Sequence, residues 1–278
     1  MILPRIAVVA CWAAIITVLD RLFFPIEFPS TAHALVGIAL GLLLVFRTNA
    51  SYDRFWEGRR QWGSLINASR NLARGSVAIM SASSESSKQV RLWTAAFAYA
   101  LMHRLRDQSG FGEFSKKLPE NSVGRCIDSG NTPLAAAIQI SSAISAARNA
   151  SEITDHQQHL LDTQVANLVD VAGACDRIHR TPLPFAYVVH LRRALVIYCL
   201  TLPPAILEGF GWWTILVSVS VAFILLGIEE IGVEIEDPFG FDDNDLPLET
   251  FCTTIERDLE GVAKEIDTSA LDLNHEHA

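Results

Sequence analysis

Carboxylate side chains gather in one segment of the chain, Glu229–Glu249 (EEIGVEIEDPFGFDDNDLPLE), which contains neither Lys nor Arg. The segment offers hard oxygen ligands of the kind that Ca²⁺ prefers, from Asp237, Asp242, Asp243 and Asp245. The regular Asp spacing and the closing Glu of an EF-hand loop are missing. Two interpretations therefore stay open. The segment is a candidate site for Ca²⁺ or another divalent cation, or it is a solvated acidic turn whose charges pair with the arginines after Arg47.

Other patterns that support catalysis or metal binding are absent from the sequence. It contains no GxSxG, HExxH, P-loop or CxxC motif. His156 and His159 are three residues apart and could share one face of a helix, but a pair of exposed histidines explains them equally well. The five cysteines are scattered, which fits small buried side chains. The sequence therefore predicts that the protein is not an enzyme and requires no cofactor.

Arginine and aromatic residues are concentrated just after one apolar stretch. The stretch is Ala32–Phe46, it contains Gly37 and Gly41, and Arg47 ends it. The segment Arg54–Arg74 that follows is rich in Arg and Trp. This boundary is typical of a hydrophobic helix that leaves the bilayer on its basic, cytosolic side. We expect the segment to form an amphipathic helix beneath the membrane, with guanidinium groups that stack on Trp faces or reach lipid headgroups.

The composition indicates an integral membrane protein with a substantial part outside the bilayer. Half of the 278 residues are apolar and only 19% are charged, and the mean hydropathy is +0.27. The net charge of −9 argues against a nucleic-acid partner, because nucleic acid needs a basic face. Four apolar stretches are candidate spans, each shorter than the roughly 20 residues that cross a bilayer. They are Ile6–Leu19, Ala32–Phe46, Ala194–Leu207 and Trp212–Ile228.

Basic residues give the expected orientation. Of the 22 Lys and Arg residues, 16 lie between Arg47 and Arg180, and the short loops at Pro25–Thr31 and Glu208–Gly211 have none. The positive-inside rule places both termini and the central region in the cytosol. We expect four parts: two spans, a cytosolic helical region, two further spans and an acidic cytosolic C-terminal segment. Their ranges are 1–46, 47–187, 188–228 and 229–278.

The central region reads as helical. Apolar residues recur with a helical period in His159–Ile178, and Thr154 precedes them as a start signal. Pro133 stands at a plausible first position of another helix. We expect loops at 81–87 and 109–131, where polar and turn-forming residues are frequent. The pair Pro203-Pro204 is expected to kink or end the third span, because proline removes a helical hydrogen bond.

Three motifs resemble the bestrophin family, and more closely its bacterial branch. They are FRTNASYDRFWEGRRQWGSLIN (Phe46–Asn67), TPLPFAY (Thr181–Tyr187) and EDPFGFDDNDLPLE (Glu236–Glu249). The resemblance runs from the first span to about Leu259. It implies an all-α membrane protein of the bacterial inner membrane, with four transmembrane helices per subunit and a helical cytosolic region. It also implies a homopentamer in membrane lipid, with permeating small ions in one central pore.

The resemblance also assigns residues. Its hydrophobic pore neck falls on Ile38, Leu42 and Phe46. A second, cytosolic aperture falls at Leu183. The calcium clasp of animal bestrophins matches Asp237, Asp242 and Asp245 of this sequence. Phe241 and Asn244 replace acidic residues of that clasp, and bacterial members do not depend on calcium, so the metal site stays open.

The spacing of the neck residues has a physical consequence of its own. Ile38, Leu42 and Phe46 recur every four residues, so they drift slowly around one helical face. Five copies would form three stacked apolar rings, which gate by excluding water rather than by coordinating ions. Gly37 and Gly41 beside them would let helices approach closely.

Apolar rings do not select a sign of charge. The acidic balance of the chain favours monovalent cations, since fixed negative charge concentrates cations at a pore mouth. Two alternatives remain: an anion (chloride) channel of the same fold, and a membrane scaffold that does not conduct.

Overall fold

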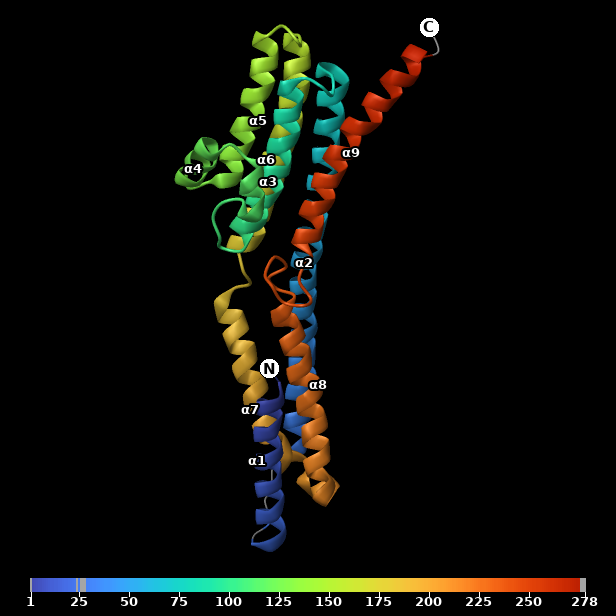
Figure 1. The fold of residues 1–278 in the computed structure, drawn as a ribbon. Helices are drawn as coiled ribbons and strands as arrows, with labels where there is room; N and C mark the ends of the chain where they lie inside the picture. Colours follow the sequence, from blue (N-terminus) through green and yellow to red (C-terminus); the bar gives the residue numbers. More distant parts are fainter. Residues whose placement is uncertain (1, 24, 26–28, 276–278) are drawn as a thin grey trace. The chain divides into compact units, whose positions relative to one another are not determined.

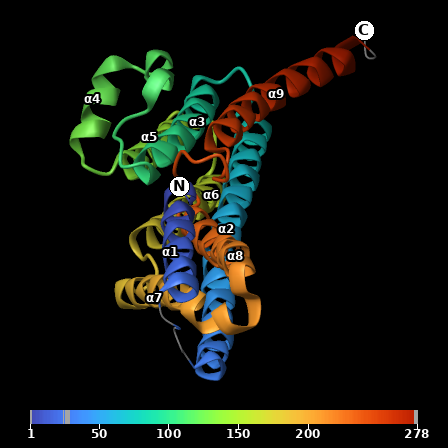
Figure 2. The same ribbon diagram turned by 90° about the horizontal axis from the view of Figure 1, so that it is seen from below.

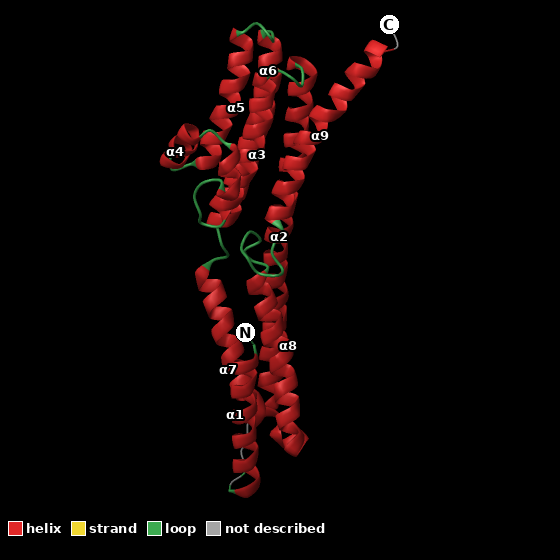
Figure 3. Ribbon diagram, viewed as in Figure 1, coloured by secondary structure: helices red, strands yellow, loops and turns green. Residues whose placement is uncertain are grey.

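The fold is built from helices, and the computed structural model describes residues 2–23, 25 and 29–275. No strand occurs in those ranges, as Figure 3 shows. The chain divides into two compact units. We call the first, residues 1–56 and 182–238, the membrane unit, and the second, residues 57–181 and 239–278, the helical unit.

The membrane unit contains four long helices where four apolar stretches predicted spans (Figure 1). They are α1 (Leu3–Leu22), the first part of α2 (Ser30–Met80), α7 (Phe185–Phe210) and α8 (Thr214–Glu234). Three stretches of the described residues are long and apolar enough to cross a membrane: α1, α2 and Phe185–Glu234. The last stretch holds both α7 and α8, which are separated by the short 3₁₀ turn Gly211–Trp213. At a rise of about 1.5 Å per residue, helices of 20 or more residues reach about 30 Å.

Two apolar clusters hold the four helices together. Val9, Cys199, Ala222 and Leu226 join α1, α7 and α8, which lie side by side in Figures 1 and 2. A second cluster joins α2 to α7, through Leu40 and Leu44 on one helix and Leu191 and Leu195 on the other.

The two glycines of the apolar part of α2 have different surroundings. A Cβ atom at Gly37 would lie 2.5 Å from the Tyr198 hydroxyl, so α2 and α7 approach closely there, as predicted for a small residue. No atom of the described chain lies within 4 Å of a Cβ built at Gly41. Within one subunit, only Gly37 serves the predicted close packing.

Of the two expected effects of Pro203-Pro204, an end of the third span at these residues is wrong. Both prolines lie inside α7, which continues to Phe210. Pro204 has no N–H to donate to the carbonyl of Leu200, four residues earlier. The indole N–H of Trp12 on α1 donates to that carbonyl at 2.7 Å instead. A neighbouring helix thus satisfies the group that the proline frees, which is how prolines are tolerated in transmembrane helices.

We predict that Trp12→Phe destabilises the membrane unit. The substitution keeps an aromatic ring but removes the N–H that reaches Leu200, at a cost of about 1 kcal/mol. The midpoint of thermal unfolding in detergent should fall. Trp213→Phe is the control, because Trp213 is largely exposed and donates no hydrogen bond among the described residues. Equal midpoints for both variants would contradict the role of Trp12.

The helical unit confirms several predicted signals. It contains the second part of α2 with α3 (Glu85–Leu105), η1 (Gly112–Lys117), α4 (Glu120–Asp128), α5 (Thr132–Asn149), α6 (Asp155–Arg180) and α9 (Leu248–His275). Pro133 occupies the first turn of α5, and Thr154 forms a capping box with Gln157 at the start of α6. One expectation is wrong, because the segment 109–131 is not a single loop: η1 and α4 lie within it. The acidic C-terminal segment, for which no secondary structure was predicted, ends in the long helix α9.

The unit boundaries fall at 56/57, 181/182 and 238/239, whereas the expected parts divide at 46/47, 187/188 and 228/229. Each expected boundary lies inside a helix: α2, α7 or α8. The apolar stretch of α2 ends at Phe46, but a change from apolar to polar residues does not break a helix whose backbone remains hydrogen-bonded.

The segment Arg54–Arg74 is therefore a continuation of α2 and not a separate helix. Within the helical unit, several of its side chains contact α9. Trp62 is fully buried against Phe251 of α9. The Arg59 guanidinium lies 4.9 Å from the centre of the Phe251 ring, and Arg70 pairs with Asp258 at 2.7 Å. An arginine thus stacks on an aromatic ring, but the ring is Phe251 and not a Trp as predicted.

Candidate functional site

The three predicted neck residues share one exposed face of α2. Ile38 is 71% exposed, Leu42 55% and Phe46 56%. At about 100° per residue they fall within about 80° of one another around the helix axis. Large apolar side chains on one exposed stripe indicate a surface covered by lipid or by other subunits.

The opposite face of α2 is buried. Leu40, Leu44, Arg47 and Ser51 form this second stripe. The two leucines pack on α7, and the Tyr187 hydroxyl donates to the carbonyl of Leu43 at 2.9 Å. These contacts fix the rotation of α2 about its own axis. The stripe with Ile38, Leu42 and Phe46 is exposed because the other side of the helix is held.

A buried carboxylate, Glu229 on α8, forms ion pairs with one arginine from each of the other three helices of the membrane unit. Its Oε1 accepts from Arg47 of α2 and from Arg192 of α7, each at 3.0 Å. Its Oε2 accepts from Arg5 of α1 at 3.2 Å. The side chains of Arg47 and Glu229 are each 1% exposed. Paired, hydrogen-bonded charges of this kind hold helices in one arrangement at the cost of their desolvation.

Two more carboxylates complete this group. Arg5 also reaches Glu230 at 3.5 Å, and an NH2 group of Arg47 lies 3.8 Å from Glu236. We call the six residues the Glu229 cluster: Arg5, Arg47, Arg192, Glu229, Glu230 and Glu236. Its three arginines balance its three carboxylates.

The proposed aperture residue, Leu183, lies in the segment that leads into α7. Its side chain is half-buried and its backbone N–H donates to Glu236 at 3.0 Å. The Arg54 guanidinium donates to the carbonyl of the same Glu236 at 3.0 Å. The membrane unit thus holds the backbone at Leu183 through a residue that also belongs to the Glu229 cluster.

The structure places the aspartates of the acidic segment in different units. Asp237 lies in the membrane unit, next to its last residue Pro238, whereas Asp242, Asp243 and Asp245 lie in a turn of the helical unit. The backbone N–H of Asp242 donates to the Asp245 carboxylate at 2.8 Å. Across the described residues, no three His, Cys, Asp or Glu side chains are grouped as a metal site would group them. A calcium site at these aspartates stays a prediction.

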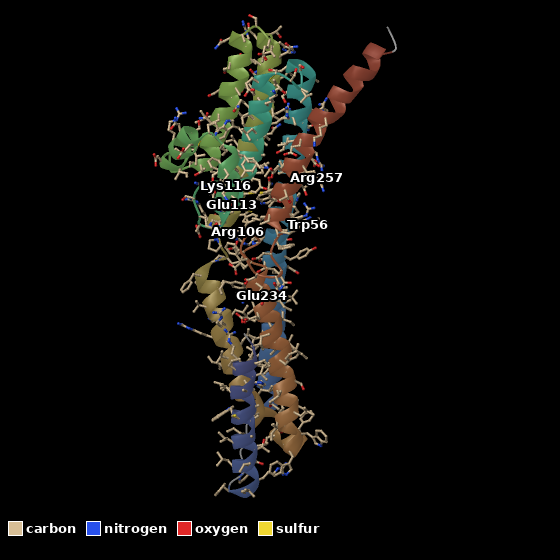
Figure 4. The ribbon with its side chains drawn as sticks, in the orientation of Figure 1. Trp56, Arg106, Glu113, Lys116, Glu234 and Arg257 are labelled. Atoms are coloured by element: carbon tan, nitrogen blue, oxygen red, sulfur yellow. The ribbon has the colours of Figure 1, made fainter. Side chains whose placement is uncertain are left out.

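An arginine organises the turn that contains Asp242. The Arg106 guanidinium (labelled in Figure 4) donates to the carbonyl of Phe239 at 3.1 Å and stacks over the Phe241 ring at 4.3 Å. It also pairs with Glu249. This contact holds the pKa of the Glu249 carboxyl below its ordinary value. The ion-pair interpretation of the acidic segment therefore applies to Glu249, and through Arg47 to Glu229.

The Glu229 cluster is the feature that sequence reasoning missed. Its signal was present: two glutamates close an apolar helix, and arginines stand near the ends of three other apolar stretches. A charge at the end of such a helix needs a partner. Which arginines supply it depends on helix packing, which the sequence alone does not give.

A comparison with known families decides the identity. A family model described as "Bacterial/Fungal Bestrophin protein" matches residues 1–261. The chain belongs to the bestrophin family. Bestrophin membership and the channel names of the relatives indicate an ion channel of bacterial membranes and not an enzyme.

Bestrophin relatives cover most of the chain. The voltage-dependent anion channel-forming protein alr2987 of Nostoc sp. is 40% identical over 263 residues, which cover 93% of this chain and 86% of that protein. The voltage-dependent anion channel-forming protein YneE of Escherichia coli K12 is 30% identical over 252 residues, covering 91% and 83%. The crystal structure of a bacterial bestrophin homologue from Klebsiella pneumoniae matches with a TM-score of 0.90 at 31% identity, covering 95% of this chain and 99% of that one.

We predict that Glu229→Gln prevents stable assembly of the membrane unit. The variant removes the charge that compensates Arg47, and an uncompensated buried charge costs about 3–5 kcal/mol. The yield of folded, detergent-extracted protein in size-exclusion chromatography should fall strongly. Glu230→Gln is the matched control at the next position, because Glu230 contacts only the partly exposed Arg5 among the three arginines of the cluster. Similar yields for both variants would refute the central role of Glu229.

Proposed function

We propose that the protein is a homopentameric channel for monovalent cations, with Ile38, Leu42 and Phe46 as its hydrophobic neck. The observation that carries this proposal is the exposed apolar stripe on α2, opposite a face that is fixed by packing and by the Glu229 cluster. Five copies of this stripe around an axis form three apolar rings. The stripe could face either lipid or the central axis of an oligomer. Membership of a channel family supports the central axis.

The proposed neck works by controlling water. An apolar ring offers no ligand to an ion, so a narrow ring empties of water and blocks conduction, and a slightly wider one stays wet and conducts. Phe46 is the largest of the three side chains and the last before Arg47. It therefore sets the tightest ring if the helix axes are parallel. Leu183 forms the second constriction in this proposal, in line with the family resemblance.

Both termini are placed in the cytosol of the bacterial cell in this proposal. The support is the distribution of charge and aromatic residues. Exposed Trp212 and Trp213 stand at the turn between α7 and α8, where interfacial tryptophans are common. Arg5, Arg47 and Arg192 stand at the opposite ends of the apolar parts of α1, α2 and α7. The positive-inside rule assigns this side to the cytosol.

The sign of the permeating ion has two candidates. The net charge of −9 supports cations. The relatives from Nostoc and Escherichia coli are named as anion channel-forming proteins. Their names favour an anion channel of the same fold as the second candidate.

A reversal potential decides between the two candidates. Purified protein is fused into a planar bilayer with unequal NaCl concentrations on the two sides. The proposal predicts a reversal potential near the sodium equilibrium value. A value near the chloride equilibrium potential would establish the second candidate, and the absence of any current would favour a scaffold that does not conduct.

Phe46→Ala tests the neck. Removal of the ring widens the proposed constriction and lowers the cost of wetting it, so sodium flux into liposomes should rise several-fold. Phe223→Ala is the matched control, because Phe223 on α8 is also more than half exposed but lies outside the proposed pore helix. A flux unchanged by Phe46→Ala, or raised equally by both substitutions, would exclude this position from the ion path.

A further inference from the structure

The exposed stripe of α2 does not end at Phe46. Asn49 and Asp53 lie 11 and 15 residues after Ile38, which places them within the same sector of about 80° of the helix. Both residues are exposed. Trp56, labelled in Figure 4, continues the stripe and is 52% exposed. The stripe therefore changes within two helical turns from apolar side chains to an amide and then a carboxylate.

The charge of Asp53 is not neutralised inside its own subunit. In the part of the chain that the structure describes, Asp53 takes part in no ion pair and no side-chain hydrogen bond. The nearest arginines along the helix are directed elsewhere. Arg47 is buried against Glu229 on the opposite face, and Arg54 donates to the carbonyl of Glu236.

The next arginines of α2 are occupied as well. Within the helical unit, Arg59 lies over the ring of Phe251, and Arg60 pairs with Glu57 at 2.9 Å. A segment that looks basic in the sequence thus leaves one unpaired acidic group on the stripe that begins with the neck residues.

We propose that Asp53 sets the sign of the ion that the channel conducts. The inference rests on the proposed channel and makes a specific residue responsible for its selectivity. Five Asp53 carboxylates surround the axis just beyond the last apolar ring. They raise the local concentration of cations and lower that of anions at this end of the neck.

The position beside the neck makes the effect strong. An ion gives up part of its hydration in an apolar constriction and regains favourable interactions where polar groups begin. The amide oxygen of Asn49 and the carboxylate of Asp53 are the first oxygen-bearing side chains on the stripe after Phe46. A monovalent cation leaving the neck meets oxygen atoms there, and an anion meets a ring of like charge.

The test compares permeability to sodium and chloride for the full-length protein in planar bilayers under a NaCl gradient. Asp53→Asn keeps the size of the side chain and removes its charge, so the permeability ratio of sodium to chloride should fall by roughly tenfold or more. Asp53→Glu should preserve the ratio. Glu208→Gln is the matched control, because Glu208 is exposed on α7 away from the stripe and its loss removes one charge per subunit.

Ionic strength provides a second readout. Exposed charges are screened within about 3 Å at 1 M salt and about 10 Å at 0.1 M. At a fixed concentration ratio, selectivity of the wild type should therefore weaken as both solutions are made more concentrated. Asp53→Asn should show little dependence on concentration.

The outcomes separate this inference from the proposed function. A wild type that conducts cations selectively, with the same ratio in Asp53→Asn, overturns the role of Asp53 and leaves the channel intact. An equal loss of selectivity in Glu208→Gln also overturns it, because total charge would then be the cause. A wild type selective for anions contradicts both the inference and the proposed ion, and a wild type without current contradicts the channel itself.

Discussion

The membrane unit depends on one buried carboxylate, that of Glu229. It is 1% exposed and accepts hydrogen bonds from arginines of α1, α2 and α7. A carboxylate withdrawn from water costs several kcal/mol unless cations and donors compensate for it. With three guanidinium groups in place, any rearrangement that separates one helix from α8 leaves charge unpaired. Apolar packing between helices in lipid has no hydrophobic driving force of its own, so this ionic junction fixes which helices are neighbours.

The same junction determines which side of α2 can meet ions. Arg47 follows Phe46 directly, and successive residues are about 100° apart around a helix. Because Arg47 must point to Glu229, Phe46 cannot point into the subunit. Ile38 and Leu42 follow Phe46 to the exposed side through their spacing of four residues. The stripe therefore results from electrostatics on the opposite face of the helix, which also withdraws a positive charge from the region just beyond the proposed neck.

Much of the architecture was readable from local patterns. Apolar stretches predicted α1, α7, α8 and the start of α2, and Thr154 marked the start of α6. The missed features depend on partners distant in sequence. Helix α7 continues past Pro203 and Pro204 with the help of a hydrogen bond from the indole of Trp12. No sequence pattern near the prolines predicts this contact. Helix α9, in contrast, has a local signal in the sequence. Its buried residues recur with a helical period, at Leu248, Cys252, Ile255 and Leu259. The acidic composition of the preceding segment obscured this pattern.

The candidate site was predictable in part for the same reason. Spacing placed Ile38, Leu42 and Phe46 on one face, and burial confirms that this face is exposed. Spacing could not show that Asp53 has no ion pair among the described residues while the arginines around it are occupied, because that depends on Glu229 of α8 and on the Glu236 carbonyl. A count of residues after Phe46 suggests a basic stripe, whereas the side-chain contacts leave Asp53 as the unpaired group on it.

Glu236 links the Glu229 cluster to Leu183, the second proposed constriction. Its carboxylate accepts the backbone N–H of Leu183 and lies 3.8 Å from Arg47. The backbone at Leu183 and the residue next to Phe46 therefore share one anionic partner within the membrane unit. Displacement of Glu236 would weaken the hold on both, so the two positions are tied through one side chain rather than through the length of α2. The positions of the proposed neck and aperture residues thus depend on where three glutamates and three arginines can neutralise one another.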